Sequence, residues 1–268
     1  MRDNGMIPPD VIITDGQLHR FKDESGKLNN WYTAHIDGRA AGTIGNWKTG
    51  VSANWKASGN YPKLTQAQRT EFKLEQQKQQ QIRKAEEKQR HDGAAHKAAS
   101  IWKQSAPAIS HSYLTLKRID PHNARLYNDA LVIPVLNNGV LVSLQFIAID
   151  GAKRFLTGGK LKGSYSQLGR HDKGQPILIC EGFATGASLA ESTDNLTFVA
   201  FSAGNLKAVA TYVRSLHSMN DIIIMGDNDV SGVGQAAARD AALAIGGKYL
   251  IPETIGYDWN DVVNKEII

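Results

Sequence analysis

The sequence is poor in cysteine and contains no long apolar run. Cys180 is the only cysteine among 268 residues, which excludes an internal disulfide and a zinc site built on several cysteines. No stretch approaches the ~20 apolar residues that a membrane-spanning helix needs. Residues 1–5 lack the apolar segment of a signal peptide. We therefore expect a cytoplasmic protein with no membrane partner.

Basic and acidic residues are distributed unevenly along the chain. Residues 1–175 contain 26 Lys and Arg against 15 Asp and Glu, whereas residues 176–268 contain 5 against 11. A basic front part suits contact with a polyphosphate such as nucleic acid, and an acidic back part suits binding of a cation. For any single lysine, ordinary surface charge is the simpler explanation. The asymmetry as a whole favours the first interpretation.

Three acids follow two short apolar runs. Residues 177–180 end at Glu181, and residues 221–226 end at Asp227 and Asp229. Such runs are typical of buried parallel strands, and ligands in open α/β sheets bind outside the carboxyl ends of the strands. Few basic residues lie near these acids in the sequence, so a cation between them would relieve their repulsion. Oxygen ligands of this kind suit Mg²⁺ or Mn²⁺.

The pattern resembles the Toprim domain, which DnaG-type primases, type IA and type II topoisomerases and some nucleases share. Glu181-Gly182 follows the first strand and Gly226-Asp227-Asn228-Asp229 follows a later one. The predicted order of the other segments is helix 184–192, strand 197–201, helix 206–216, helix 231–245 and strand 248–251. The resemblance covers about residues 176–263. It implies a Rossmann-like, mainly parallel sheet, in which Glu181, Asp227 and Asp229 are catalytic and bind two metal ions.

A further acidic pair, Asp258 and Asp261, lies where DnaG-type primases often have an Asp-Pro-Asp motif. The resemblance implies a contribution to the metal site, but the spacing differs from the motif. Which of the two acids contributes therefore stays open. The alternative is that an aspartate caps the helix predicted to begin near Asn260.

Residues 107–175 precede the Toprim-like segment and are rich in basic residues. Residues 131–135 and 140–149 are predicted to form a hairpin across Asn137-Asn138-Gly139. Residues 110–175 resemble, in position and hairpin character, the basic subdomain that holds template and nucleotides in DnaG-type primases. The candidate binding residues implied here are Lys153, Arg154, Lys160, Lys162 and Arg170.

Residues 64–104 are predicted to form a long polar helix. Glu, Gln, Lys, Arg and Ala dominate this segment, and no proline interrupts it. Its apolar positions keep no heptad, so residues 76–90 are interpreted as a solvated linker helix. From about Ala94 the helix becomes apolar enough to dock on the following residues.

Residues 7–61 are predicted to form a small β-rich module, with short strands at 11–13, 18–21, 31–36 and 42–47. Its aromatic residues alternate with basic ones, so Trp47 and Trp55 are candidates for stacking on nucleic-acid bases. The simpler alternative is that the tryptophans form the core. A Trp-Tyr-x-x-His-x-Asp-Gly pattern beginning at Trp31 resembles the N-terminal part of Toprim primases of phages and plasmids.

The predicted fold is therefore α/β. A small β-rich module (7–61) and a helical linker (64–104) precede a basic α+β subdomain (107–175) and a C-terminal Toprim catalytic domain (176–268). The resemblance implies a DNA primase of the phage or plasmid type without a cysteine zinc ribbon. It would make short RNA primers by metal-dependent nucleotidyl transfer. Its implied partners are a single-stranded DNA template, ribonucleoside triphosphates and a replicative helicase.

Two alternatives stay open at this point. The first is a small Toprim nuclease acting on DNA or RNA. The second is a non-catalytic accessory protein of replication that binds single-stranded DNA. A topoisomerase is excluded, because the chain has no room for the separate domain that carries the nucleophilic tyrosine.

Overall fold

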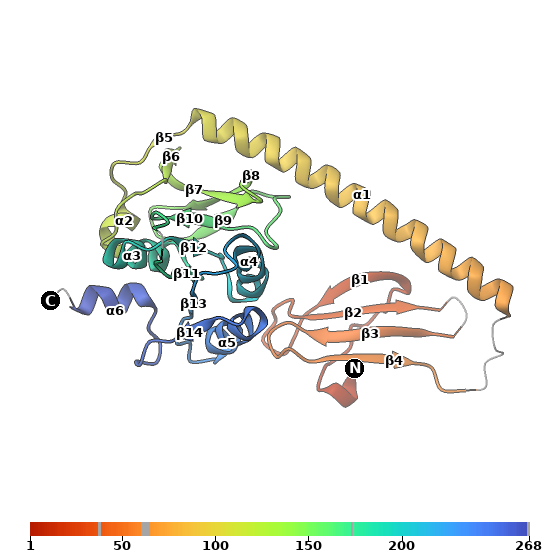
Figure 1. Ribbon diagram of the computed structural model, residues 1–268. Helices are drawn as coiled ribbons and strands as arrows, with labels where there is room; N and C mark the ends of the chain where they lie inside the picture. The colour runs from red at the N-terminus through yellow and green to blue at the C-terminus, as the bar shows by residue number, and fades with distance from the viewer. Residues whose placement is uncertain (37–38, 60–64, 173, 267–268) are drawn as a thin grey trace. The chain divides into compact units, whose positions relative to one another are not determined.

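The computed structural model describes residues 1–36, 39–59, 65–172 and 174–266 (Figure 1). The chain forms two compact units, Met1–Gln77 and Lys78–Ile268. The predicted α/β class is confirmed. The predicted boundaries at 61 and 64 lie outside the described residues. In the part of the chain that the structure describes, no helix is both long and apolar enough to cross a membrane.

The first unit contains an antiparallel sheet of four strands in the order β1-β2-β3-β4. It follows a short 3-10 helix, η1 (Arg2–Asn4). One face of the sheet buries Phe21, Tyr32 and Ile44 in a small core. The strands are β1 (Asp15–Phe21), β2 (Asn30–His35), β3 (Ala41–Asn46) and β4 (Ser52–Lys56).

Two details of this sheet differ from the prediction. The strand predicted at 11–13 is wrong, because these residues lie outside the sheet and their side chains are exposed. Pro8 and Pro9 precede them, and proline cannot donate a hydrogen bond to a neighbouring strand. The prediction also missed β4. Its residues 52–56 have no β-branched side chain, and the strand is specified by its pairing with β3.

Helix α1 (Gln66–Gln104) extends from the first unit into the second. The side chains described between residues 65 and 90 are exposed. Ala94, Ala98 and Ile101 are buried, and Ala98 and Ile101 pack on the sheet that follows. The helix therefore docks where the sequence becomes apolar.

The second unit begins with an antiparallel sheet in the order β5-β6-β7-β8-β9. Asn138 and Gly139 have φ angles of 49° and 76°, so the predicted hairpin is present with a tight turn of the type that favours Asn-Gly. One face of the sheet packs on α1 and the other on α3. The elements are β5 (Ala106–Pro107), α2 (Ser112–Lys117), β6 (Arg125–Tyr127), β7 (Ala130–Asn137), β8 (Val140–Ile147) and β9 (Lys153–Phe155).

The C-terminal sheet has the order β10-β12-β11-β13-β14, and all its strand pairs are parallel except the pair β10–β12. Ile177 and Ile179 on β11 pack towards α4 and α5, whereas Leu178 and Cys180 pack towards α3. Helices therefore cover both faces of the sheet (Figure 1). The elements are β10 (Ser166–Leu168), β11 (Ile177–Cys180), α3 (Phe183–Thr193), β12 (Thr197–Val199), α4 (Ala203–Leu216), β13 (Ile222–Met225), α5 (Val233–Ile245), β14 (Lys248–Leu250) and α6 (Trp259–Glu266).

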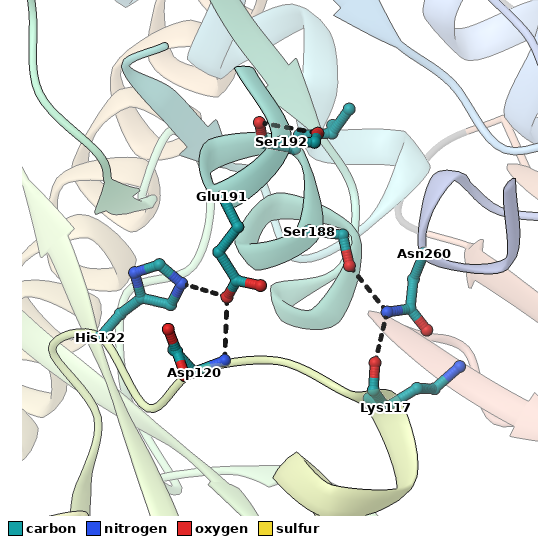
Figure 2. A network of polar contacts seen from close by, with 8 residues as sticks. Lys117, Asp120, His122, Ser188, Glu191, Ser192 and Asn260 are labelled. Atoms are coloured by element: carbon teal, nitrogen blue, oxygen red, sulfur yellow. Dashed lines mark hydrogen bonds and ion pairs between the residues drawn. The ribbon is translucent and has the colours of Figure 1, made fainter. Parts of the chain in front are cut away.

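A polar network holds α6 and the end of α2 against α3 (Figure 2). The side chain of Asn260 is buried and donates to the Lys117 carbonyl and to Ser188 Oγ, each at 2.8 Å. On the outer side of α3, Glu191 Oε1 lies 2.6 Å from His122 Nε2. Each contact joins residues far apart in the sequence, so the two sheets of the second unit are fixed to each other.

The exposure of α1 generates a prediction about its sensitivity to protease. Trypsin should cut first at Lys73, Lys78 or Arg83, because the exposed part of α1 gains little from packing and opens locally. Lys97 and Lys103 are matched sites on the same helix, also exposed, but on the docked part. Mass analysis of the first fragments would measure the order of cleavage. Cleavage at Lys97 and Lys103 as early as at Lys73, Lys78 or Arg83 would contradict an exposed tether that ends before Ala94.

Candidate metal centre

The three predicted acids lie together at the carboxyl edge of the C-terminal sheet. Glu181 directly follows β11, and Asp227 and Asp229 follow β13, which is its parallel neighbour. A Cβ atom added to Gly234 would lie 2.9 Å from Asp229 Oδ2 and 3.2 Å from Glu181 Oε1. Both carboxylates therefore lie close to Gly234, where a side chain would crowd them.

Burial and the charges of neighbouring acids make Glu181 and Asp227 hard to ionise. Burial and the charges of Asp227 and Asp229 raise the pKa of Glu181 to about 7. Burial and the charges of Asp258 and Asp229 raise the pKa of Asp227 to about 7. Glu181 Oε1 and Asp227 Oδ1 are buried and have no hydrogen-bond partner among the described residues. Buried polar atoms are normally paired, so these oxygens fit contact with a cation.

The acids do not form a closed metal cage. Within residues 1–36, 39–59, 65–172 and 174–266, no group of three or more His, Cys, Asp and Glu side chains is arranged to hold an ion. Mg²⁺ usually keeps several waters and is held by one or two carboxylates together with substrate phosphates. The arrangement therefore fits an open Mg²⁺ site that a substrate completes.

Two residues that the sequence analysis missed hold the acidic loop in place. The Gly234 N–H donates to Asp229 Oδ2 at 3.0 Å. Gln235 Nε2 donates to Asn228 Oδ1 at 2.6 Å and to the Asp229 carbonyl at 2.8 Å. Asn228 in turn donates to the Pro252 carbonyl at 2.7 Å. A glutamine early in an alanine-rich helix gives no signal of such a role in the sequence.

Asp258 and Asp261 form a reciprocal cap at the start of α6. The Asp258 N–H donates to Asp261 Oδ2 at 3.1 Å, and the Asp261 N–H donates to Asp258 Oδ1 at 3.0 Å. Helix capping, the alternative raised by the sequence, is therefore present. Both charges also raise the pKa of Asp227, and Asp258 contributes more than Asp261. Asp258 therefore has the larger electrostatic effect of the two on Asp227.

The fold brings one basic residue, Lys153, to the acids. Its Nζ lies 5.5 Å from the centre of the Tyr113 ring. Its side chain is exposed overall, but burial around the ammonium lowers the Lys153 pKa, an effect that the charges of Asp258 and Asp227 oppose. The sequence places Lys153 far from these acids, and only the packing of β9 beside the C-terminal sheet shows the relation.

The other predicted basic residues do not gather around Lys153. Arg154 is the next residue of β9 and lies over the Phe146 ring, with its Cζ 5.6 Å from the ring centre. Lys160 and Lys162 line a cavity beside α1. Arg170 is exposed and makes a backbone bridge with Asn195. The basic loop is therefore divided between different surfaces.

Trp47 and Trp55 lie on opposite faces of the N-terminal sheet. Trp47 stacks on Trp31 with ring centres 6.0 Å apart, and the Arg20 guanidinium lies 4.6 Å from the Trp47 ring centre. Trp55 pairs with Gly42 on the face that carries the core. Their exposed fractions are 51% for Trp47 and 36% for Trp55. Neither forms part of the buried core, so the simpler alternative, a core built on Trp47 and Trp55, does not hold.

Comparison with known proteins gives one family match and several similar chains. Residues 176–267 match the family model described as the Toprim domain. Two relatives from Escherichia coli, both named DNA primase TraC, are 31% identical over 258 and 261 residues. These alignments cover 90% and 91% of this chain but 24% and 18% of the relatives. The chain thus spans a quarter or less of the length of these relatives.

Among solved structures, the primase fragment of the bacteriophage T7 primase-helicase protein is similar with a TM-score of 0.48 and 16% identity. The alignment covers 93% of this chain and 95% of that one. The family match confirms the interpretation of the C-terminal segment as a Toprim domain.

Proposed function

We propose that this protein is a DNA primase that synthesises short RNA primers on single-stranded DNA. The observation that carries the proposal is the extent of the similarity to TraC primases, which covers 90% of the chain. It therefore includes residues before the Toprim segment, which a nuclease built on Toprim alone would not require. The acidic site at residues 181, 227 and 229 supplies chemistry suited to this reaction.

In this proposal Glu181, Asp227 and Asp229 hold the metal, and Asp258 adds negative charge from the start of α6. When bound, two Mg²⁺ or Mn²⁺ ions would activate the 3′-hydroxyl and neutralise charge on the pyrophosphate leaving group. Glu181, at the end of β11, would also position the attacking hydroxyl. Lys153, which faces the acids from β9, is positioned to contact the triphosphate of the incoming ribonucleotide.

The partners of the reaction follow from the same proposal. A template strand of DNA and ribonucleoside triphosphates are the substrates. A replicative helicase would deliver the template, and replication of a phage or plasmid in the cytoplasm is the proposed setting. The similarity to TraC primases supports the setting.

Primer synthesis should depend on Asp227. Replacing Asp227 by Asn keeps the volume but removes a metal ligand, so ribonucleotide incorporation on a single-stranded template should fall by more than the ~10–100-fold typical of losing an outer-shell partner. Asp240→Asn is the matched control, because Asp240 is an exposed aspartate on α5. Wild-type incorporation by Asp227→Asn, with metal present, would remove the site from the mechanism.

Stability without metal should depend on pH. An acid whose pKa is raised by folding contributes stability below its unfolded pKa and loses it as the pH rises through its folded pKa, here about 7 for Glu181 and Asp227. The metal-free protein should therefore lose stability as the pH rises from about 4 to about 7, between the ordinary pKa values of 3.8 and 4.5 and the raised values in the fold. Saturating Mg²⁺ should reverse that loss and release protons. Thermal denaturation would measure the loss and its reversal, and a pH indicator would measure the protons released. A pH profile for Asp227→Asn identical to that of the wild type would refute the prediction.

The N-terminal sheet should contact single-stranded DNA through the face that carries Trp47, opposite the core. Stacking on an aromatic side chain contributes ~1–3 kcal/mol per base, so Trp47→Ala should weaken oligonucleotide binding by roughly 5- to 150-fold. Trp55→Ala is the matched control, because Trp55 lies on the opposite face. Fluorescence anisotropy would give both affinities, and circular dichroism would show that the variants fold. Equal losses of affinity in the two variants would show that DNA binding does not depend on the face that carries Trp47.

A further inference from the structure

Two histidines lie together at the amino edge of the C-terminal sheet, opposite the edge that carries the acids. His171 lies in the loop between β10 and β11, and His217 directly follows α4. Their ring centres are 4.9 Å apart, and the ring planes meet at 66°. The strands that come after these two segments, β11 and β13, are parallel neighbours. The histidine pair and the acids therefore lie at opposite ends of the same two strands.

We propose that His171 and His217 together bind a divalent transition-metal ion such as Zn²⁺. The inference goes beyond the proposed function and does not depend on it. An ion at this place would tie the loop before β11 to the end of α4, and so hold the connection between the basic subdomain and the C-terminal sheet.

The spacing of the two rings fits a shared ion. A tetrahedral zinc ion lies about 2.0–2.1 Å from each imidazole nitrogen, so two rings that share it have centres about 5 Å apart. The observed distance between the ring centres is 4.9 Å. Edge-to-face packing of two rings gives similar distances. The two explanations differ in what the ring nitrogens do.

The ring nitrogens of the pair are open to an ion. Among the described residues, neither ring of the pair has a hydrogen bond, whereas the rings of His96, His111 and His122 each have one. Burial and the charge of His171 lower the pKa of His217. The His217 ring is therefore neutral near pH 7 and keeps the lone pair that binds a metal.

Hydrogen bonds hold the two segments in place without an ion. Asn220 Nδ2 donates to the Gln175 carbonyl at 3.4 Å, which joins the loop before β11 to the turn after α4. Arg214 Nη1 donates to the carbonyls of His217 at 3.2 Å and Asn220 at 2.7 Å, so its donors are directed at the backbone of that turn. The histidine pair is thus preformed, and binding an ion costs little ordering entropy.

Two imidazoles leave the coordination of the ion incomplete. In the part of the chain that the structure describes, no third His, Cys, Asp or Glu side chain is grouped with the pair. Water would fill the remaining positions, as it fills the open position of catalytic zinc sites. Imidazole suits Zn²⁺, Cu²⁺ and Ni²⁺, whereas Mg²⁺ prefers oxygen ligands. The histidine pair and the acids should therefore select different ions.

The experiment titrates the full chain, free of any affinity tag, with ZnCl₂ near neutral pH and at saturating Mg²⁺. His171→Gln and His217→Gln each remove one ligand. His96→Gln is the matched control, because it removes an exposed histidine on α1. Isothermal titration calorimetry would give the zinc affinity of each chain, and circular dichroism would show that the variants fold. Any zinc bound at the acids would be common to all four chains.

We expect each ligand variant to bind zinc at least ~10-fold more weakly than the wild type, since even an outer-shell partner is worth ~10–100-fold in metal affinity. The control should bind zinc like the wild type. Unchanged zinc affinity in both ligand variants would overturn the inference.

A second measurement needs no variant. One equivalent of Zn²⁺ should shift the imidazole nitrogen resonances of both His171 and His217 in the wild-type chain, and signals that stay in place would also overturn the inference. A chain that shows these shifts but fails to incorporate ribonucleotides would refute the primase proposal and leave the histidine site standing.

Discussion

The structure depends on keeping carboxylates together, against their mutual repulsion, at one edge of a parallel sheet. The strands beneath them are buried on both faces, so the backbone at this edge is rigid. Helix N-termini supply part of the compensation: the Ala203 N–H at the start of α4 lowers the pKa of Glu181, and the Gly234 N–H near the start of α5 donates to Asp229. Backbone dipoles thus stabilise negative charge at this edge of the sheet. The remaining repulsion, seen in the raised pKa values of Glu181 and Asp227, is then available to favour metal binding.

Alternation along one short strand, β9, places two neighbouring basic side chains on opposite faces of the sheet. Lys153 and Arg154 are adjacent in β9, so their side chains point to opposite faces of the sheet. Lys153 pairs with Ile147, on the face that packs against the C-terminal sheet, and Arg154 pairs with Phe146, on the face that packs against α1. A shift of one residue in the β8–β9 register would exchange the two side chains and bring the Arg154 guanidinium, in place of the Lys153 ammonium, to the face of the acids. The register of this edge strand therefore matters to the chemistry of the neighbouring sheet.

Local patterns predicted the C-terminal sheet well because its strands are apolar runs that end in Glu181 and in Asp227. The expected helix of residues 206–216 and strand of 197–201 agree with α4 and β12 to within a few residues. Features set by pairing between distant segments were not predictable in this way. The sequence grouped Trp47 with Trp55, and only strand register shows that they occupy opposite faces. It likewise grouped Lys153 with Lys160, because neither the strand direction nor the docking of α1 can be read from charge and spacing.

The acidic pair at the start of α6 shows how one aspartate can serve both folding and the site. The cap uses Oδ1 of Asp258 and Oδ2 of Asp261, so each carboxylate keeps a second oxygen outside the cap. Helix α6 is anchored by Asn260 and by Trp259, whose Nε1 donates to the Gly226 carbonyl at 3.1 Å, directly before Asp227. Asn260 and Trp259 therefore fix the start of α6, and with it Asp258, through contacts that do not involve the Asp258 charge. Because the position is fixed in this way, Asp258 raises the pKa of Asp227 rather than swinging away from it, and a helix start becomes part of the electrostatics of the acidic site.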